Sequence, residues 1–98
     1  MDIALTPNIV KLLQAFLEVP AERRSDTRLT KETGIAPGSL YPALHRLEAA
    51  GFIVGEEELI DPRSEGRPAR PYCTLTVEGV REAYLALARL SAAVAPPA

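Results

Sequence analysis

The sequence predicts a mainly α-helical chain with one small β-hairpin, an α+β fold of the winged helix-turn-helix type followed by a C-terminal helix. Three observations indicate this fold. Residues 29–51 read as two short helices joined by a tight turn, residues 52–76 as two strands around a polar loop, and residues 77–94 as an apolar helical repeat. We therefore divide the chain into a winged helix-turn-helix domain, residues 1–76, and a C-terminal helix with its tail, residues 77–98.

The turn between the two short helices is set by a glycine and a proline. Gly34 stands where the first of them must end, since glycine takes a left-handed conformation at little cost. Ile35 is expected to enter the core, and Pro37 to occupy the first turn of the next helix, where a missing N–H is harmless. In that helix, residues 37–50, a buried stripe and a solvent face are predicted. The stripe is Leu40, Leu44 and Leu47, and the solvent face is Ser39, Pro42, His45, Arg46 and Ala49.

One further helix, the first of the chain, is expected before these two short helices. Thr6 and Pro7 can open the first one, which ends before Pro20. Its apolar residues follow helical spacing and define a core face: Ile9, Leu12, Leu13, Phe16 and Leu17. Residues 21–26 are predicted to form a polar loop in which Arg23 and Arg24 are solvated. One of residues 25–27 caps the second helix, which runs to about Thr33.

A β-hairpin is predicted directly after the helix-turn-helix. Gly51 ends the third helix, residues 52–59 read as a strand, and residues 72–76 as its partner. The intervening residues 60–71 are rich in turn formers and carry Arg63, Arg67 and Arg70. Such a hairpin with a basic loop is a wing. For Arg67 the structural alternative is a turn residue paired with Glu65.

The C-terminal helix is predicted to begin after Thr76 as its cap. A heptad-like seam runs along it, formed by Val77, Val80, Tyr84, Leu87, Ser91 and Val94. An adjacent face holds Ala83, Ala86, Leu90 and Ala93. This apolar arc is broader than one small core covers, so we predict a homodimer interface at the seam. The alternative is that the helix packs on the first helix of its own chain, which could also contribute to a dimer interface.

Composition excludes several classes of protein. With 98 residues, 47% hydrophobic and 24% charged, the chain is a single globular unit of modest core. One Cys and one His cannot form an internal disulfide or an ordinary zinc site, so we expect no metal and no cofactor, with Cys73 a small buried strand residue. No membrane-length apolar run or secretion signal is present, which predicts a cytoplasmic protein with no membrane partner. Without a phosphate loop or metal cluster, an enzyme is not expected.

The net charge of −2 argues against a non-specific polyanion binder, but its distribution matters more. Residues 20–50 carry five basic and four acidic side chains, and residues 61–71 carry three against two. The acidic run Glu56–Glu58 accounts for the deficit and reads as a solvated strand. Local positive potential therefore remains available on the predicted turn and wing.

Two segments carry a family resemblance. Residues 38–51, GSLYPALHRLEAAG, resemble the G-[ST]-LYP-x-L-x-RLE-x-x-G signature of the PadR family of transcriptional regulators. Residues 65–79 are similar to that family's GRPxRxYxLTxxG segment, and the two blocks together with the spacing between them cover about half the chain in the family's order. The resemblance implies a winged helix-turn-helix homodimer that binds pseudo-palindromic promoter DNA, usually as a repressor released by a small-molecule effector or a stress signal.

Three departures from the family pattern qualify this resemblance. Residues 24–27 replace a Tyr-Gly element, and Pro71 precedes the wing tyrosine. A single C-terminal helix is typical of the short subfamily, and the absence of Trp removes the tryptophan-sandwich ligand site of some relatives.

Candidate contacts to double-stranded DNA lie on three elements. The third helix is expected to enter the major groove, and the second helix to contact backbone phosphates. The wing is expected along the minor groove. The candidates are, in that order, Ser39, Tyr41, Pro42, His45 and Arg46; Arg28 and Lys31; Arg63, Arg67 and Arg70. Structural alternatives are that Tyr41 packs on the first helix, that His45 is merely exposed, and that Arg46 pairs with Glu48.

Two other functions fit the same fold. A winged helix can serve as a protein-interaction module without DNA binding. It can also serve as a small-molecule sensor with a hydrophobic cleft between the last helices, either without DNA binding or together with it. The operator, the regulated gene, the effector and the sign of regulation are not encoded in recognisable form.

Overall fold

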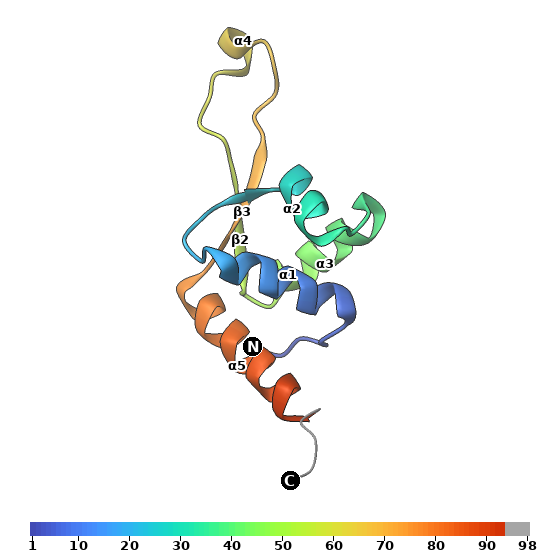
Figure 1. Cartoon of the computed structure of the whole chain (residues 1–98). Helices are drawn as coiled ribbons and strands as arrows, with labels where there is room; N and C mark the ends of the chain where they lie inside the picture. Colours follow the sequence, from blue (N-terminus) through green and yellow to red (C-terminus); the bar gives the residue numbers. More distant parts are fainter. Residues whose placement is uncertain (94–98) are drawn as a thin grey trace.

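The structure is a computed structural model that describes residues 1–93. In chain order the elements are α1 (Pro7–Glu18), β1 (Arg24–Ser25), α2 (Asp26–Thr33), α3 (Pro37–Ala49), β2 (Ile53–Glu57), α4 (Pro62–Glu65), β3 (Pro71–Leu75) and α5 (Val77–Ala93). The strands form one antiparallel sheet in the order β1-β3-β2, and the β2–β3 hairpin projects away from the helical body (Figure 1). The predicted α+β fold class is confirmed.

The core lies where α1, α2 and α3 meet the base of the hairpin. The residues that fill it come from every major element: Ile9, Leu12, Leu13, Phe16, Leu29, Ile35, Leu40, Ala43, Leu44, Leu47, Phe52, Ile53, Leu75 and Ala83. The stripe predicted on α3 is therefore buried. Gly34 ends α2 with φ 73°, and its N–H donates to the Thr30 carbonyl at 2.8 Å, as expected for a left-handed cap.

The wing has a shorter first strand and a more structured loop than predicted. Strand β2 ends at Glu57, and the register runs from Ile53 opposite Leu75 to Glu57 opposite Pro71. At the tip, α4 replaces part of the expected turn region. Asp61 caps this single turn by accepting from the Arg63 N–H and the Ser64 hydroxyl, both at 3.0 Å, and Gly66 ends it with φ 67°.

The prediction of a solvated Arg24 is wrong. Arg24 is only 1% exposed and lies in β1, opposite Cys73 of β3. Nη1 donates to the carbonyls of Phe16 at 3.3 Å and Val19 at 3.5 Å, and Nε lies 3.4 Å from a carboxylate oxygen of Glu32. Arg24 thus binds the carbonyls that the end of α1 leaves without helical partners. Its neighbour Arg23 is exposed, with its guanidinium 4.4 Å from the Tyr72 ring centre.

Helix α5 is joined to the core through Thr76. The Thr76 hydroxyl donates to the Gly51 carbonyl at 2.7 Å and accepts from the Gly79 N–H at 2.8 Å, which confirms the predicted cap. Ala83 and Ala86 are buried, and α5 packs against α1 and β3. In the part of the chain that the structure describes, no helix combines the length and apolar character needed to cross a bilayer.

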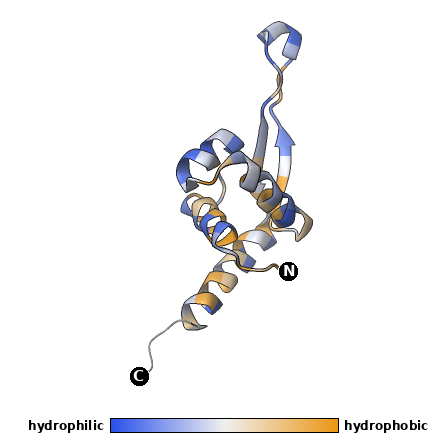
Figure 2. Cartoon of the chain, turned by 90° about the vertical axis from the view of Figure 1, so that its right-hand side faces the viewer, coloured by the Kyte–Doolittle hydropathy of each residue, from blue (hydrophilic) through white to orange (hydrophobic). Residues whose placement is uncertain are grey.

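The seam predicted along α5 divides into two parts. Val80 and Leu87 pack in part against the chain's own core. Val77 and Tyr84 are 85% and 55% exposed, and Ser91 is also exposed. The sixth member, Val94, lies outside the described residues. Alternating apolar and polar segments along α5 are visible in Figure 2.

Candidate nucleic-acid interface

Helix α3 presents one polar face to solvent. While Leu40, Ala43, Leu44 and Leu47 are buried, the residues predicted for the major groove are all exposed: Ser39, Tyr41, Pro42, His45 and Arg46. No side chain caps the helix N-terminus at Ala36, and Pro37 occupies its first turn. The N–H groups of Ser39 and Leu40 both donate to the Ala36 carbonyl at 2.9 Å, which leaves the Gly38 N–H to donate to an acceptor such as a phosphate oxygen.

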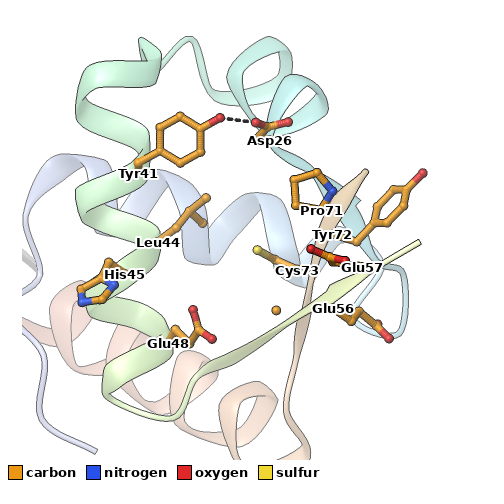
Figure 3. Close-up of a pocket in the computed structure, with 11 residues that line it drawn as sticks. Asp26, Tyr41, Leu44, His45, Glu48, Glu56, Glu57, Pro71, Tyr72 and Cys73 are labelled. Atoms are coloured by element: carbon orange, nitrogen blue, oxygen red, sulfur yellow. Dashed lines mark hydrogen bonds between the residues drawn. The ribbon is translucent and has the colours of Figure 1, made fainter. Parts of the chain in front are cut away.

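Tyr41 lies over the junction between α3 and α2. Its side chain is 54% exposed, and its hydroxyl donates to Oδ2 of Asp26 (Figure 3). The alternative of packing on the first helix is wrong, because the partner is at the start of α2. This hydrogen bond lowers the pKa of Asp26 and raises the pKa of Tyr41.

The two candidate cations on α2 differ in their surroundings. Arg28 forms ion pairs with Glu22 and with Glu32, the latter at 2.6 Å between Nε and Oε1. The hydrogen bond from Arg28 lowers the pKa of Glu22. Lys31 is exposed and forms no ion pair within residues 1–93. A phosphate would therefore meet a full charge at Lys31 and a partly neutralised one at Arg28.

The wing shows the same contrast. Arg67 donates two hydrogen bonds to Glu58, from Nη1 to Oε1 at 2.6 Å and from Nη2 to Oε2 at 3.2 Å. The alternative, that Arg67 pairs with Glu65, is therefore wrong. This pairing lowers the pKa of Glu58 and raises the pKa of Arg67. Arg63 and Arg70 are exposed and form no ion pair within the described chain. The hydrogen bonds between Glu58 and Arg67 therefore join the two sides of the wing loop.

A cleft between α3 and the hairpin brings together residues that the sequence analysis did not connect. Its lining includes Asp26, Glu48 and Glu57, which come from α2, α3 and β2 (Figure 3). Cys73, expected to be buried, is only partly so and also borders this cleft; burial raises the pKa of its thiol. No local pattern could have signalled this site, because its members meet only through tertiary packing.

A helix-turn-helix with a polar second helix, followed by a basic hairpin, defines a winged helix-turn-helix protein. The model of the Transcriptional regulator PadR-like family matches residues 23–92. The chain belongs to this family, which confirms the resemblance seen in residues 38–51 and 65–79.

Individual proteins are similar to this chain either in sequence or in fold. Transcriptional regulator Rv3488 from Mycobacterium tuberculosis (strain ATCC 25618 / H37Rv) is 53% identical over 30 residues, which is 31% of this chain and only 28% of that protein. Among solved structures, a transcriptional regulator homologue protein from Pyrococcus horikoshii OT3 aligns with a TM-score of 0.74 at 20% identity, over 91% of this chain and 81% of that one. The transcriptional repressor BigR from Xylella fastidiosa aligns with a TM-score of 0.65 at 16% identity, over 95% and 81%. At these identities the structural likeness shows the fold.

Proposed function

We propose that the chain acts as a homodimer that binds pseudo-palindromic promoter DNA in a sequence-specific manner and represses transcription. The observation that carries the proposal is the exposed polar face of α3, which stands beside a hairpin bearing three arginines. Membership of a transcriptional regulator family supports the same reading. We also propose that the protein works in the cytoplasm and is not an enzyme.

On DNA, α3 would lie in the major groove and the wing along the adjacent minor groove. Arg46 and His45 would face base edges, while Lys31, Arg63 and Arg70 supply unpaired positive charge for phosphates. If each protomer places these three cations on phosphates, the dimer makes about six contacts, and log K would fall with log salt at a slope of about −5. Arg28 and Arg67 would contribute less, because each must first leave a carboxylate.

The dimer would form through α5. Val77, Tyr84 and Leu85 remain exposed after α5 has packed on its own core, which leaves an apolar strip for a second copy. A two-fold axis there would set the two α3 helices about 34 Å apart, one turn of the duplex. The repressor BigR shares this fold, and blocking of a promoter is the simplest action of such a dimer.

DNA binding is tested by fluorescence anisotropy with the DNA upstream of the protein's own gene. Arg46→Ala should weaken binding about tenfold or more, because it removes a cation from the presented face of α3. Lys11→Ala is the matched control: it removes an exposed cation from α1, outside the proposed interface, and should stay within about twofold. Equal effects of the two variants would remove α3 from the interface.

Dimer formation is tested by light scattering during gel filtration. The wild type should elute with twice the chain mass of 10.6 kDa, and Tyr84→Asp should shift it to the monomer. Val54→Asp is the matched control and should leave the dimer intact. It makes the same kind of change at a side chain of similar exposure, 50% for Val54 against 55% for Tyr84, but on β2. A dimer that survives Tyr84→Asp, or a monomeric wild type, contradicts the proposed α5 interface.

A further inference from the structure

The cleft between α3 and the β2–β3 hairpin has the size of a small-molecule site. Its volume is about 520 Å³, within the range of about 300–1,000 Å³ that is usual for ligand pockets. Its lining is mainly apolar, with Leu44 on the α3 side and Pro71 and Cys73 on the β3 side (Figure 3). Neither the notion of a cleft between the last helices nor the proposed DNA contacts account for this cavity.

The strand register shows which side chains face the cleft. Ile53 and Leu75 are a buried cross-strand pair, so alternate positions outward from it share their face of the hairpin. Gly55 opposite Cys73, and Glu57 opposite Pro71, are those positions. Glu56 also borders the cleft, but its register position is on the other face of the hairpin, and its carboxylate accepts from the Thr74 hydroxyl at 3.1 Å.

The charge of the cleft is negative and uncompensated. Asp26, Glu48 and Glu57 reach it from three different elements, and no Lys or Arg lines it. None of these three carboxylates takes part in an ion pair within residues 1–93. Glu48 and Asp26 add to burial in raising the pKa of the Cys73 thiol, so their field reaches the floor of the cleft. Carboxylates around an apolar hollow concentrate cations there.

The arrangement does not suit a metal ion. Among the described residues, no group of three or more His, Cys, Asp and Glu is placed to hold one. Dispersed carboxylates around an apolar floor instead match a larger cation whose charge is attached to a hydrophobic body.

We infer that this cleft binds a hydrophobic organic cation. The apolar body lies on Leu44, Cys73 and Pro71, and the positive charge lies among Asp26, Glu48 and Glu57. The ring of Tyr41, at the edge of the cleft, adds a face on which a cation can rest.

A bound cation would also affect DNA binding, and this part of the inference rests on the proposed function. Tyr41 and His45 line the cleft and belong to the face of α3 that we place in the major groove. An occupant that covers them competes with DNA, so the ligand would act as an inducer. Because binding free energies are reciprocal, DNA would weaken cation binding by the same factor.

The site is tested by calorimetry on the full chain without DNA, with tetraphenylphosphonium as the probe. Tetraphenylborate has nearly the same shape and the opposite charge, so it isolates the electrostatic part of the binding. Glu48→Gln and Glu57→Gln should each weaken tetraphenylphosphonium about three- to tenfold, as expected for one charge removed at close range. Glu18→Gln removes the same charge from an exposed position on α1, outside the lining of the cleft, and should change affinity less than about twofold. Equal binding of the two probes, or equal effects of the three variants, would overturn the inference.

Gly55→Leu provides a second, steric test. Gly55 does not have a positive φ, and an added Cβ would lie 3.6 Å from a carboxylate oxygen of Glu48, an ordinary contact. The variant should keep its thermal midpoint and lose at least about tenfold in tetraphenylphosphonium affinity, because its side chain fills the cleft. Unchanged affinity in a folded Gly55→Leu protein would place the probe elsewhere and refute the site.

The effect on DNA is measured separately, by anisotropy with saturating tetraphenylphosphonium. We expect DNA affinity to fall about fivefold or more in the wild type and to stay unchanged in Gly55→Leu. Unaltered DNA affinity in the wild type, with the probe shown to be bound, refutes the competition alone. If the wild type binds no DNA at all, the proposed function fails, while the calorimetry still decides whether the cleft binds the cation.

Discussion

The buried guanidinium of Arg24 gives the sharpest test of how the fold is held together. Arg24 is 1% exposed and donates to two carbonyls at the end of α1, at 3.3 and 3.5 Å. Methionine keeps an unbranched apolar stem but is shorter than arginine and cannot donate, so Arg24→Met removes the Arg24 donor from the buried Phe16 carbonyl. The Val19 carbonyl keeps the Glu22 N–H, which donates to it at 3.0 Å. Loss of the partner of one buried carbonyl costs about 1–3 kcal/mol.

Two further effects change the stability that Arg24→Met is expected to lose. Both hydrogen bonds are long, and the variant no longer has to desolvate a guanidinium, which offsets part of the loss. Glu32 also loses the Arg24 partner, but it is partly exposed and keeps Arg28. We therefore expect a net destabilisation of about 1–2 kcal/mol. At about 4–8 °C per kcal/mol, the thermal midpoint should fall by roughly 5–15 °C.

The assay is urea unfolding followed by circular dichroism, with every variant at one protein concentration because a dimer's stability depends on it. Arg23→Met is the matched control: its guanidinium is exposed and contacts only the Tyr72 ring, so the change should cost less than about 1 kcal/mol. If Arg24→Met proves as stable as Arg23→Met, the idea that Arg24 secures the end of α1 is refuted.

Three other predictions concern backbone and titration. Gly34→Ala places a side chain at φ 73° and should lower the free energy of unfolding by about 1 kcal/mol. Gly38→Ala, in α3 with open space around it, should raise it by about 0.5–1 kcal/mol. Thermal midpoints of the two variants that move in the same direction would contradict this. Gly79→Ala puts a Cβ 2.0 Å from the Phe52 carbonyl oxygen and should destabilise the fold by about 3 kcal/mol or more in urea unfolding; a near-neutral effect would show that α5 can shift. Tyr41→Phe removes the hydrogen bond that lowers the pKa of Asp26. A carboxyl with a lowered folded pKa stabilises the fold above its unfolded value of about 3.9, and that gain is lost as the pH falls through the folded pKa. Tyr41→Phe should thus be less stable than wild type at pH 7, with the gap closing below about pH 4; a gap independent of pH would exclude this linkage.

The sequence was most informative where local chemistry decides the structure. Gly34 and Pro37 place the turn, and the spacing of Leu40, Leu44 and Leu47 places the buried face of α3, because caps and helical periodicity act over a few residues. The end of α1 before Pro20 and the cap at Thr76 follow from the same rules.

The errors concern features too short for a periodic pattern. Strand β1 has two residues, so no alternation distinguishes it from a loop, and the burial of Arg24 follows from its pairing with β3. Helix α4 did carry a signal, since Asp61, Pro62 and Gly66 are a cap, a first-turn proline and a C-terminal glycine. Four residues are too few to show an apolar face, and these residue types also favour turns.

The electrostatics of the site could not be obtained from the sequence at all. Arg67 pairs with Glu58, nine positions away, and not with the nearer Glu65. Asp26, Glu48 and Glu57 meet in one cleft only because the sheet places the hairpin against α3. Charge counts along the chain describe a surface on average, whereas binding depends on which charges remain unpaired at one place.

The central claim is that paired α3 helices read successive major grooves on one face of a duplex. Hydroxyl-radical footprinting of the DNA upstream of the gene tests it most directly. We expect two protected patches about 10–10.5 base pairs apart on one face, retained with Lys11→Ala and lost with Arg46→Ala at equal protein concentration. A folded, dimeric protein that leaves no protection at low salt, or patches that Arg46→Ala does not change, would contradict it.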